Sequence, residues 1–159
     1  MARSYGRARG GDRLVLPQPY ARGNKFSIVG AVSIQKVVAA MYAEGSIDGV
    51  FFTHFIEHYL APELKSGDQV IMDNVAFHKV KRVKEIIESQ GASLIYLPPY
   101  SPDLSPIENM WSKLKSILRK FAARTVDTFQ EAISEAFKLI KSSDLQGWFQ
   151  HCGYKDQIF

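Results

Sequence analysis

Two stretches decide the fold: Gln-Val-Ile-Met-Asp-Asn-Val-Ala-Phe-His at 69–78 and Ser-Leu-Ile-Tyr-Leu-Pro-Pro-Tyr-Ser-Pro-Asp-Leu-Ser-Pro-Ile-Glu at 93–108. Their apolar beginnings, 69–73 and 93–97, are predicted to be short strands. The apolar positions of 80–87 recur at helical spacing, so a helix is expected between the strands. A strand, a helix and a second strand in this order predict a parallel pair joined by a right-handed crossover. The chain is therefore expected to be a mixed α/β protein.

The flanking elements follow from the same periodicities. The runs 26–34 and 37–42 are β-rich and only Gln35-Lys36 separates them, which predicts an antiparallel hairpin. Further expected elements are a helix over 51–60 that ends at Pro62, a helix opened by Ser105-Pro106, a last long helix starting near Thr128 with Glu131 as a capping partner, and a short C-terminal element holding Trp148, Phe149 and Tyr154. Gly91 is the expected terminator of the 80–87 helix.

Composition bounds the kind of protein. A chain of 159 residues is one domain's worth, and we divide it into a basic arm (1–24) and one domain (25–159). No apolar run approaches the ~20 residues of a membrane span. The single Cys152 permits no internal disulfide and no cysteine metal cage, so an intracellular protein without membrane association is expected.

The positive charge is clustered. Twenty Lys and Arg residues face sixteen Asp and Glu, for a net charge of +4. The basic groups are Arg3, Arg7, Arg9, Arg13, Arg22 and Lys25; Lys79, Lys81, Arg82 and Lys84; and Lys113, Lys115, Arg119, Lys120 and Arg124. Separated basic clusters suit a polyanion such as DNA. The alternative for any one cluster is a solvated helix face.

Two acids stand out by their position. Asp73 closes the first predicted strand, and ligand sites in α/β proteins form at the carboxyl ends of strands. Glu108 follows the proline-rich segment at the start of a predicted helix. Each also has a plain structural explanation, since Asp is common in turns and Ser105-x-x-Glu108 is a good capping box. Trp111 is interpreted as a core residue of the same helix.

Read together, 70–78 and 97–111 resemble the second and third catalytic blocks of the Tc1/mariner and bacterial IS630 transposases. Asp73 and Glu108 are 35 positions apart, the spacing of that superfamily, and the Pro-Tyr-Ser-Pro-Asp-Leu-Ser-Pro-Ile-Glu-Asn run is highly specific to it. The resemblance implies an RNase H-like fold with an Asp-Asp-Glu triad, in which Asp73 is the second acid and Glu108 the third. The family's first acid lies on a strand upstream of an Arg-Gly arm that resembles 5–13. The first strand and the helix-turn-helix domain are therefore expected to be lacking here.

The function that the resemblance implies is metal-dependent phosphodiester hydrolysis and strand transfer on transposon-end DNA. Mg²⁺ (or Mn²⁺) is the expected cofactor, held by Asp73 and Glu108, and the missing first acid predicts weak metal binding without robust cleavage. Expected neighbours of the site are Asn74, His78 and Asn109, and expected DNA contacts are Arg7, Arg9, Arg13, Lys79, Lys113, Lys115 and Arg119. The expected partners are double-stranded DNA, as transposon ends and target, and a second copy in a synaptic homodimer.

Two other functions remain open. A non-catalytic remnant would bind DNA through its basic surface alone. Whichever function holds, the expected location is the cytoplasm, in association with the nucleoid if the protein is bacterial. A stand-alone RNase H-like nuclease is the third reading, and the proline-rich block argues against it.

Overall fold

The computed structural model describes residues 26–121 and 126–154. The predicted basic arm, with Arg7, Arg9 and Arg13, lies outside the described residues. None of the described helices is both long enough and apolar enough to cross a membrane.

The chain begins with the predicted hairpin. Strands β1 (Phe26–Val32) and β2 (Val37–Glu44) pair antiparallel, with Ser33 closing the turn by hydrogen bonds to Lys36. The β-branched and small residues of both runs suit a pleated ladder. The prediction of an antiparallel hairpin is confirmed.

The two faces of this hairpin carry two different cores. Ile28 lies opposite Tyr42, and both pack against a cluster built from α3 and α4 (bounds below). The next pair, Val29 and Met41, packs against the other cluster, built from α1, α2 and β3. Alternation along a strand sends neighbours to opposite faces, so one hairpin serves both cores.

A mixed helical rod follows. Helix α1 (Gly49–Phe55) continues as a π-helical turn η1 (Ile56–Leu60) and a 3-10 turn η2 (Ala61–Glu63). Asp48 caps its start, because its carboxylate accepts a hydrogen bond from the Phe51 amide at 2.8 Å. Pro62 lies in the first turn of η2, where a missing N–H costs nothing, so the rod runs slightly past the proline that was expected to end it.

The central unit has the predicted order. Its elements are β3 (Gln69–Met72), η3 (Ala76–Lys79), α2 (Lys81–Ser89) and β4 (Ser93–Tyr96). The two strands pair in parallel, from Gln69 beside Ser93 to Met72 beside Tyr96. Gly91 ends α2 with a φ of 75°, and its amide donates to the Glu88 carbonyl at 3.0 Å, as a C′ glycine does.

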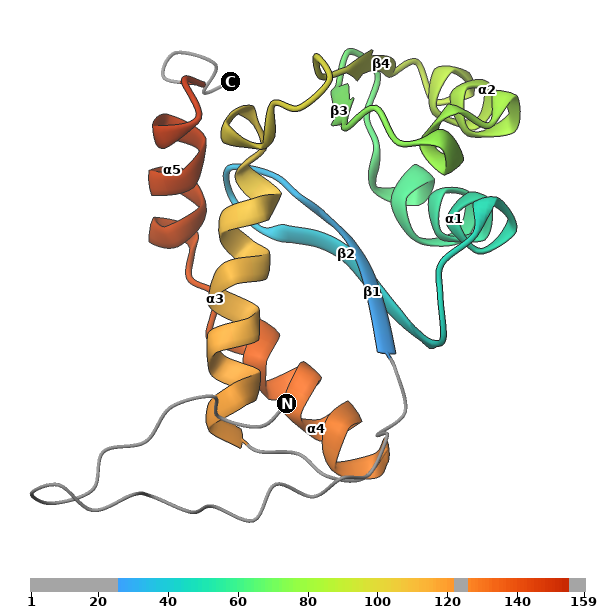
Figure 1. The fold of residues 1–159 in the computed structure, drawn as a ribbon. Coiled ribbons are helices and arrows are strands. Elements are labelled where there is room, and N and C mark those ends of the chain that lie inside the picture. The colour runs from blue at the N-terminus through green and yellow to red at the C-terminus, as the bar shows by residue number, and fades with distance from the viewer. Residues whose placement is uncertain (1–25, 122–125, 155–159) are drawn as a thin grey trace, which may run out of the picture.

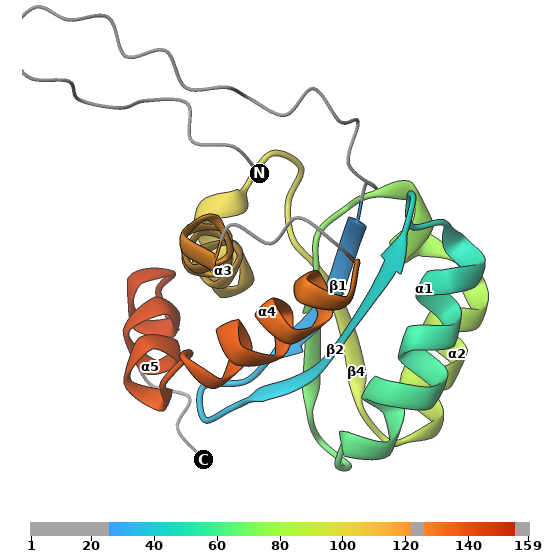
Figure 2. The same cartoon turned by 90° about the horizontal axis from the view of Figure 1, so that it is seen from below.

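The C-terminal part is helical. It contains η4 (Pro102–Leu104), α3 (Pro106–Phe121), α4 (Val126–Lys138) and α5 (Ser142–His151). Helix α4 begins two residues before the predicted start, and the expected short C-terminal element is the ten-residue helix α5. Figures 1 and 2 show α3, α4 and α5 gathered on one side of the hairpin and α1 and α2 on the other.

Within the described residues the sheet is in two pieces. The hairpin β1–β2 and the parallel pair β3–β4 form separate two-stranded sheets. Helix α3 is seated closely on the hairpin, because Gly30 leaves room for Trp111: a Cβ at position 30 would lie 3.2 Å from the Trp111 ring. Trp111 packs against the α3–α4 core, as predicted, and this seating sets where the first turn of α3 lies relative to β3.

Candidate metal and nucleic-acid site

Asp73 stands immediately after β3. The last bond of the parallel ladder runs from the Leu97 amide to the Met72 carbonyl at 2.8 Å, and the side chain of Met72 is buried. With Met72 anchored in the core, the next side chain points away from it, and that of Asp73 is 52% exposed. The strand end therefore presents a carboxylate to solvent at the edge of the parallel pair.

Glu108 occupies the first turn of α3. Pro106 opens the helix, and the Glu108 amide donates to the Ser105 carbonyl at 3.1 Å. The predicted capping box is not formed, since within the described residues no hydrogen bond or ion pair engages the exposed Glu108 carboxylate. An acid in the first helical turn is favoured by the helix dipole, so the carboxylate is stable there without a side-chain partner.

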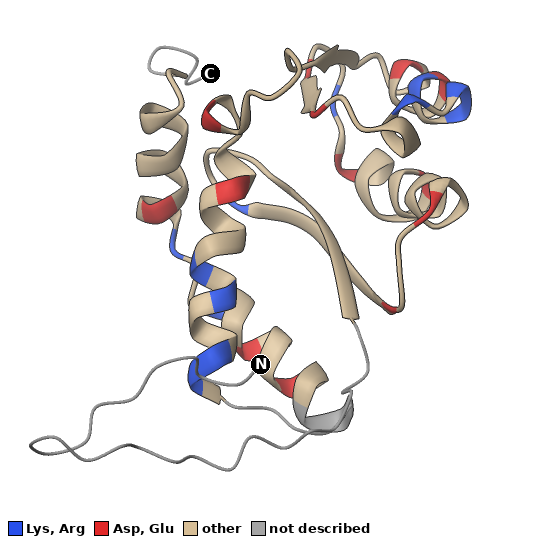
Figure 3. Cartoon of the chain, viewed as in Figure 1, with Lys and Arg blue, Asp and Glu red and all other residues tan. Residues whose placement is uncertain are grey.

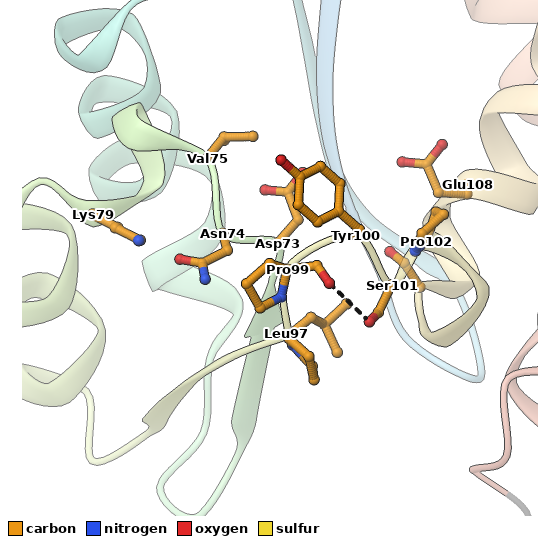
Figure 4. A pocket seen from close by; sticks show the side chains of 12 residues that line it. Asp73, Asn74, Val75, Lys79, Leu97, Pro99, Tyr100, Ser101, Pro102 and Glu108 are labelled. Atoms are coloured by element: carbon orange, nitrogen blue, oxygen red, sulfur yellow. Dashed lines mark hydrogen bonds between the residues drawn. The ribbon is translucent and has the colours of Figure 1, made fainter.

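One cavity brings the two acids together. Asp73 and Glu108 line the same cavity of about 500 Å³, together with Asn74, Lys79 and the 97–102 loop. Figure 4 shows both carboxylates at this opening. The predicted neighbour Asn74 and the predicted DNA contact Lys79 thus both line this cavity. The packing of α3 on the hairpin and the pairing of β3 with β4 bring the two acids to one place.

His78, which was expected near the site, is in direct contact with Asp73. Its Nδ1 lies 2.5 Å from Oδ1 of Asp73 and 3.4 Å from the Asp73 carbonyl oxygen. The imidazole is only 16% exposed and packs against Phe52, with ring centroids 4.2 Å apart, while Tyr96 donates to the His78 carbonyl at 3.0 Å. His78 therefore contacts one carboxylate oxygen of Asp73, and its own position is fixed by packing against Phe52 and by the hydrogen bond from Tyr96.

Two predicted site residues lie elsewhere. Asn109 points toward α5, where its Nδ2 lies 3.9 Å from Sγ of Cys152. Lys113 pairs with Asp144 of α5 at 2.5 Å. Both placements have one cause: at roughly 3.6 residues per turn, Asn109 and Lys113 lie about 100° and 140° around the helix from Glu108. They therefore face α5 rather than the cavity.

The cations of α2 are largely balanced. Lys81 lies 3.5 Å from Glu85, Lys84 lies 3.7 Å from Glu88, and Arg82 lies 3.0 Å from Glu57 of η1. Figure 3 shows acids and bases intermingled on this helix but basic residues alone toward the end of α3. The alternative reading of a solvated, ion-paired face therefore fits the cluster on α2.

The Lys113–Asp144 pair is an ion pair that joins α3 to α5. The Lys113 ammonium, and then the Lys141 amide at 2.8 Å, hold the pKa of Asp144 below its usual 3.8. A lowered pKa in the folded chain stabilises the fold above the unfolded-state value. That stabilisation is lost as the pH falls through the folded-state value.

Replacing Asp144 with Asn is expected to lower the free energy of unfolding by about 1 kcal/mol at pH 7, because it leaves Lys113 without its counter-ion. The deficit relative to the parent should shrink as the pH falls through the folded-state pKa of Asp144, which lies below 3.8, because the parent carboxylate then also becomes neutral. Urea unfolding at pH 7 and at a pH well below 3.8 measures this deficit in the free energy of unfolding. Glu135→Gln, which removes the exposed partner of Lys138, is the control and should cost close to nothing. A deficit that is equal at both pH values would contradict the assignment.

The fold and the two acids together define a class of protein. An α/β domain with two carboxylates at the end of a parallel strand and in the first turn of a following helix is typical of acid-based metal sites for phosphate chemistry. The DDE superfamily endonuclease domain matches residues 1–131, and the chain belongs to this family.

Individual relatives agree with the family. The Tc3 transposase of Caenorhabditis elegans is 23% identical over 130 residues, which are 78% of this chain and 40% of that protein. The Mos1 mariner paired-end complex with Mn superimposes with a TM-score of 0.78 at 14% identity, covering 96% of this chain and 48% of that one. The Mos1 strand-transfer complex gives a TM-score of 0.73 at 13% identity, covering 96% of this chain and 47% of that one.

These likenesses bear on the predictions in two ways. The RNase H-like fold and the Tc1/mariner relationship are confirmed. The chain also spans less than half the length of the Tc3 transposase and of these Mos1 chains.

Proposed function

We propose that this chain is the catalytic domain of a DNA transposase, in which Asp73 and Glu108 hold a divalent metal ion against a DNA phosphate. The observation that carries this is the shared cavity: two acids 35 positions apart line one opening. Family membership supports the same reading. The substrates would be transposon ends and target DNA, handled by a synaptic homodimer.

The residues present suit Mg²⁺ or Mn²⁺. Carboxylate oxygens are the ligands that these ions prefer, and Mg²⁺ is commonly held by one or two carboxylates together with waters and substrate phosphates. Asp73 has one oxygen against His78, which orients the carboxylate and leaves its other oxygen for the metal. When bound there, the ion would polarise the scissile phosphate and activate the attacking hydroxyl or water.

The described residues supply two acids to the cavity. Within the part of the chain that the structure describes, no group of three His, Cys, Asp or Glu residues is placed to hold a metal. A two-metal mechanism needs further ligands to hold both ions about 3.5–4 Å apart. We therefore expect one weakly held ion and little cleavage by this chain alone.

The DNA path is proposed along α3. Glu108, Lys115 and Arg119 are exposed and fall within about 40° of one another around the helix, with Ser112 and Ser116 exposed beside them. Lys115 and Arg119 form no ion pair with a described residue. This stripe runs about 16 Å along the helix from the site acid, enough to follow a phosphate backbone. Lys79 would add a contact at the cavity itself.

The alternative function is DNA binding without chemistry, through the exposed basic residues of α3. A Mn²⁺ titration of the chain separates the two functions. The transposase reading expects one saturable site that depends on both Asp73 and Glu108. A DNA-binding remnant would bind duplex DNA and show no such site.

A further inference from the structure

Tyr100 has an unusual backbone. Within the described residues it is the one non-glycine residue with a positive φ, at 58°. The left-handed conformation is destabilising for any L-residue that has a Cβ, and it is rare for residues with bulky side chains. Such strain persists where the surroundings impose it, and it gathers at functional sites. Here the surroundings are three prolines, Pro98, Pro99 and Pro102, which restrict the loop on both sides of Tyr100.

The Tyr100 side chain is not buried in either core of the described fold. It is 101% exposed. The other described tyrosines all have partners: Tyr42 packs in the α3–α4 core, Tyr59 stacks on Phe55, Tyr96 donates to His78, and Tyr154 donates to Leu104. A tyrosine normally contributes by burying its ring or by hydrogen bonding its hydroxyl. Tyr100 does neither with any described residue.

The ring stands at the proposed metal site. Tyr100 lines the same cavity as Asp73 and Glu108, and Figure 4 shows its side chain in the space between theirs. The loop from β4 to α3 thus places a bare aromatic face where a DNA phosphate would be held. A ligand for that face needs a flat, apolar surface attached to a phosphate.

We infer that Tyr100 is a stacking platform for an unpaired nucleobase next to the phosphate held at Asp73 and Glu108. This inference rests on the proposed function, because those two acids place the phosphate. The base must be unpaired, since both faces of a base within a duplex are covered by its neighbours. Stacking is tolerant of base identity, so the platform would position a frayed or single-stranded DNA end without reading its sequence.

The test compares a blunt DNA duplex with duplexes that carry a 3′ or a 5′ single-stranded overhang, with 2-aminopurine as the first unpaired base. Binding is measured in EDTA, so that no metal is needed. The parent should bind one overhang duplex more tightly than the blunt one and quench the 2-aminopurine. Tyr100→Ala should weaken overhang binding by about 5- to 100-fold and leave blunt binding unchanged.

Three further variants and one modified DNA isolate the contribution of the ring. Tyr100→Phe and Tyr100→Trp should keep the preference, because stacking needs the π-face and not the hydroxyl. Tyr100→Gly relieves the positive φ, so it should be at least as stable as the parent and still lose the preference. An abasic first nucleotide should abolish the preference of the parent.

The inference is overturned if Tyr100→Ala keeps the parent's ratio of overhang to blunt affinity, or if Tyr100→Phe loses the preference for the overhang as Tyr100→Ala does. It is also overturned if the parent binds the abasic overhang as tightly as the intact one. The last result would point to another occupant, such as an apolar protein side chain. Failure here, with Mn²⁺ binding that still depends on Asp73 and Glu108, would leave the proposed function standing. Loss of all DNA binding by the parent would overturn both.

Discussion

Asp73→Ala and Glu108→Ala should each lower the Mn²⁺ affinity of this chain by more than about 10-fold, and the double variant should show no saturable binding. Each substitution removes a carboxylate from a cavity in which the described residues supply only two. Even groups that merely orient a metal ligand are worth about 10- to 100-fold in affinity, so a ligand itself should be worth at least that. Electron paramagnetic resonance of free Mn²⁺, or calorimetry, measures the effect.

A matched acid controls for simple loss of charge. Asp103 is exposed in η4, five residues before Glu108, and does not line the cavity. Asp103→Asn should leave Mn²⁺ affinity unchanged, whereas the isosteric Asp73→Asn and Glu108→Gln should lower it as the Ala variants do. If Asp73→Ala and Glu108→Ala both bind Mn²⁺ as the parent does, the assignment of the site is wrong.

The double variant Lys115→Gln/Arg119→Gln should reduce the slope of log affinity against log salt concentration by about 2 for a random-sequence duplex. Each lysine or arginine that neutralises a phosphate contributes about 0.9 to that slope by releasing a counterion. Both side chains are exposed on the stripe that leads from Glu108, and neither has an acidic partner in the described part of the chain. Fluorescence anisotropy over a salt series in EDTA gives the slope without any contribution from metal.

The control removes the same charge from another helix. Lys81→Gln/Lys84→Gln also deletes two cations, but on α2 these lie beside Glu85 and Glu88. Their contribution to the slope should be well under 1. Equal losses for the two double variants would mean that only net charge matters, and an unchanged slope for Lys115→Gln/Arg119→Gln would remove α3 from the DNA path. A Lys113→Gln variant tests the predicted DNA contact at Lys113, and because this lysine pairs with Asp144, we expect its contribution to the slope to be well under 1.

Local pattern was sufficient for most elements. The alternating and short apolar runs predicted the hairpin and the parallel pair, and the 3.6-residue periodicity predicted α2 and α3, because each pattern reports which side of its own element is buried. Boundaries were less accurate: the rod that starts at α1 passes Pro62, and α4 starts at Val126 rather than near Thr128. Termini depend on hydrogen bonds beyond the periodic core, which the apolar pattern does not describe.

At the site, the sequence pattern pointed to two acids that line one cavity, but it placed their neighbours less accurately. Proximity in sequence suggested Asn109 and Lys113 as companions of Glu108, yet both face α5, where Cys152 and Asp144 receive them. The helical phase alone could have separated them from Lys115 and Arg119. Tyr100 was missed altogether. Its one sequence signal is an aromatic residue set among prolines, and only the backbone angle and full exposure show what that setting does.

The amino-acid sequence by itself determined the order of strands and helices and the two acids at the ends of their elements. These follow from the near-neighbour chemistry of each segment. Only the tertiary structure decided that Asp73 and Glu108 share a cavity, that His78 holds Asp73, and that the cations of α2 are balanced while two on α3 are exposed. Those outcomes depend on how the hairpin, β3 and α3 pack against one another, because contacts between residues distant in the chain are set by the shapes of whole elements.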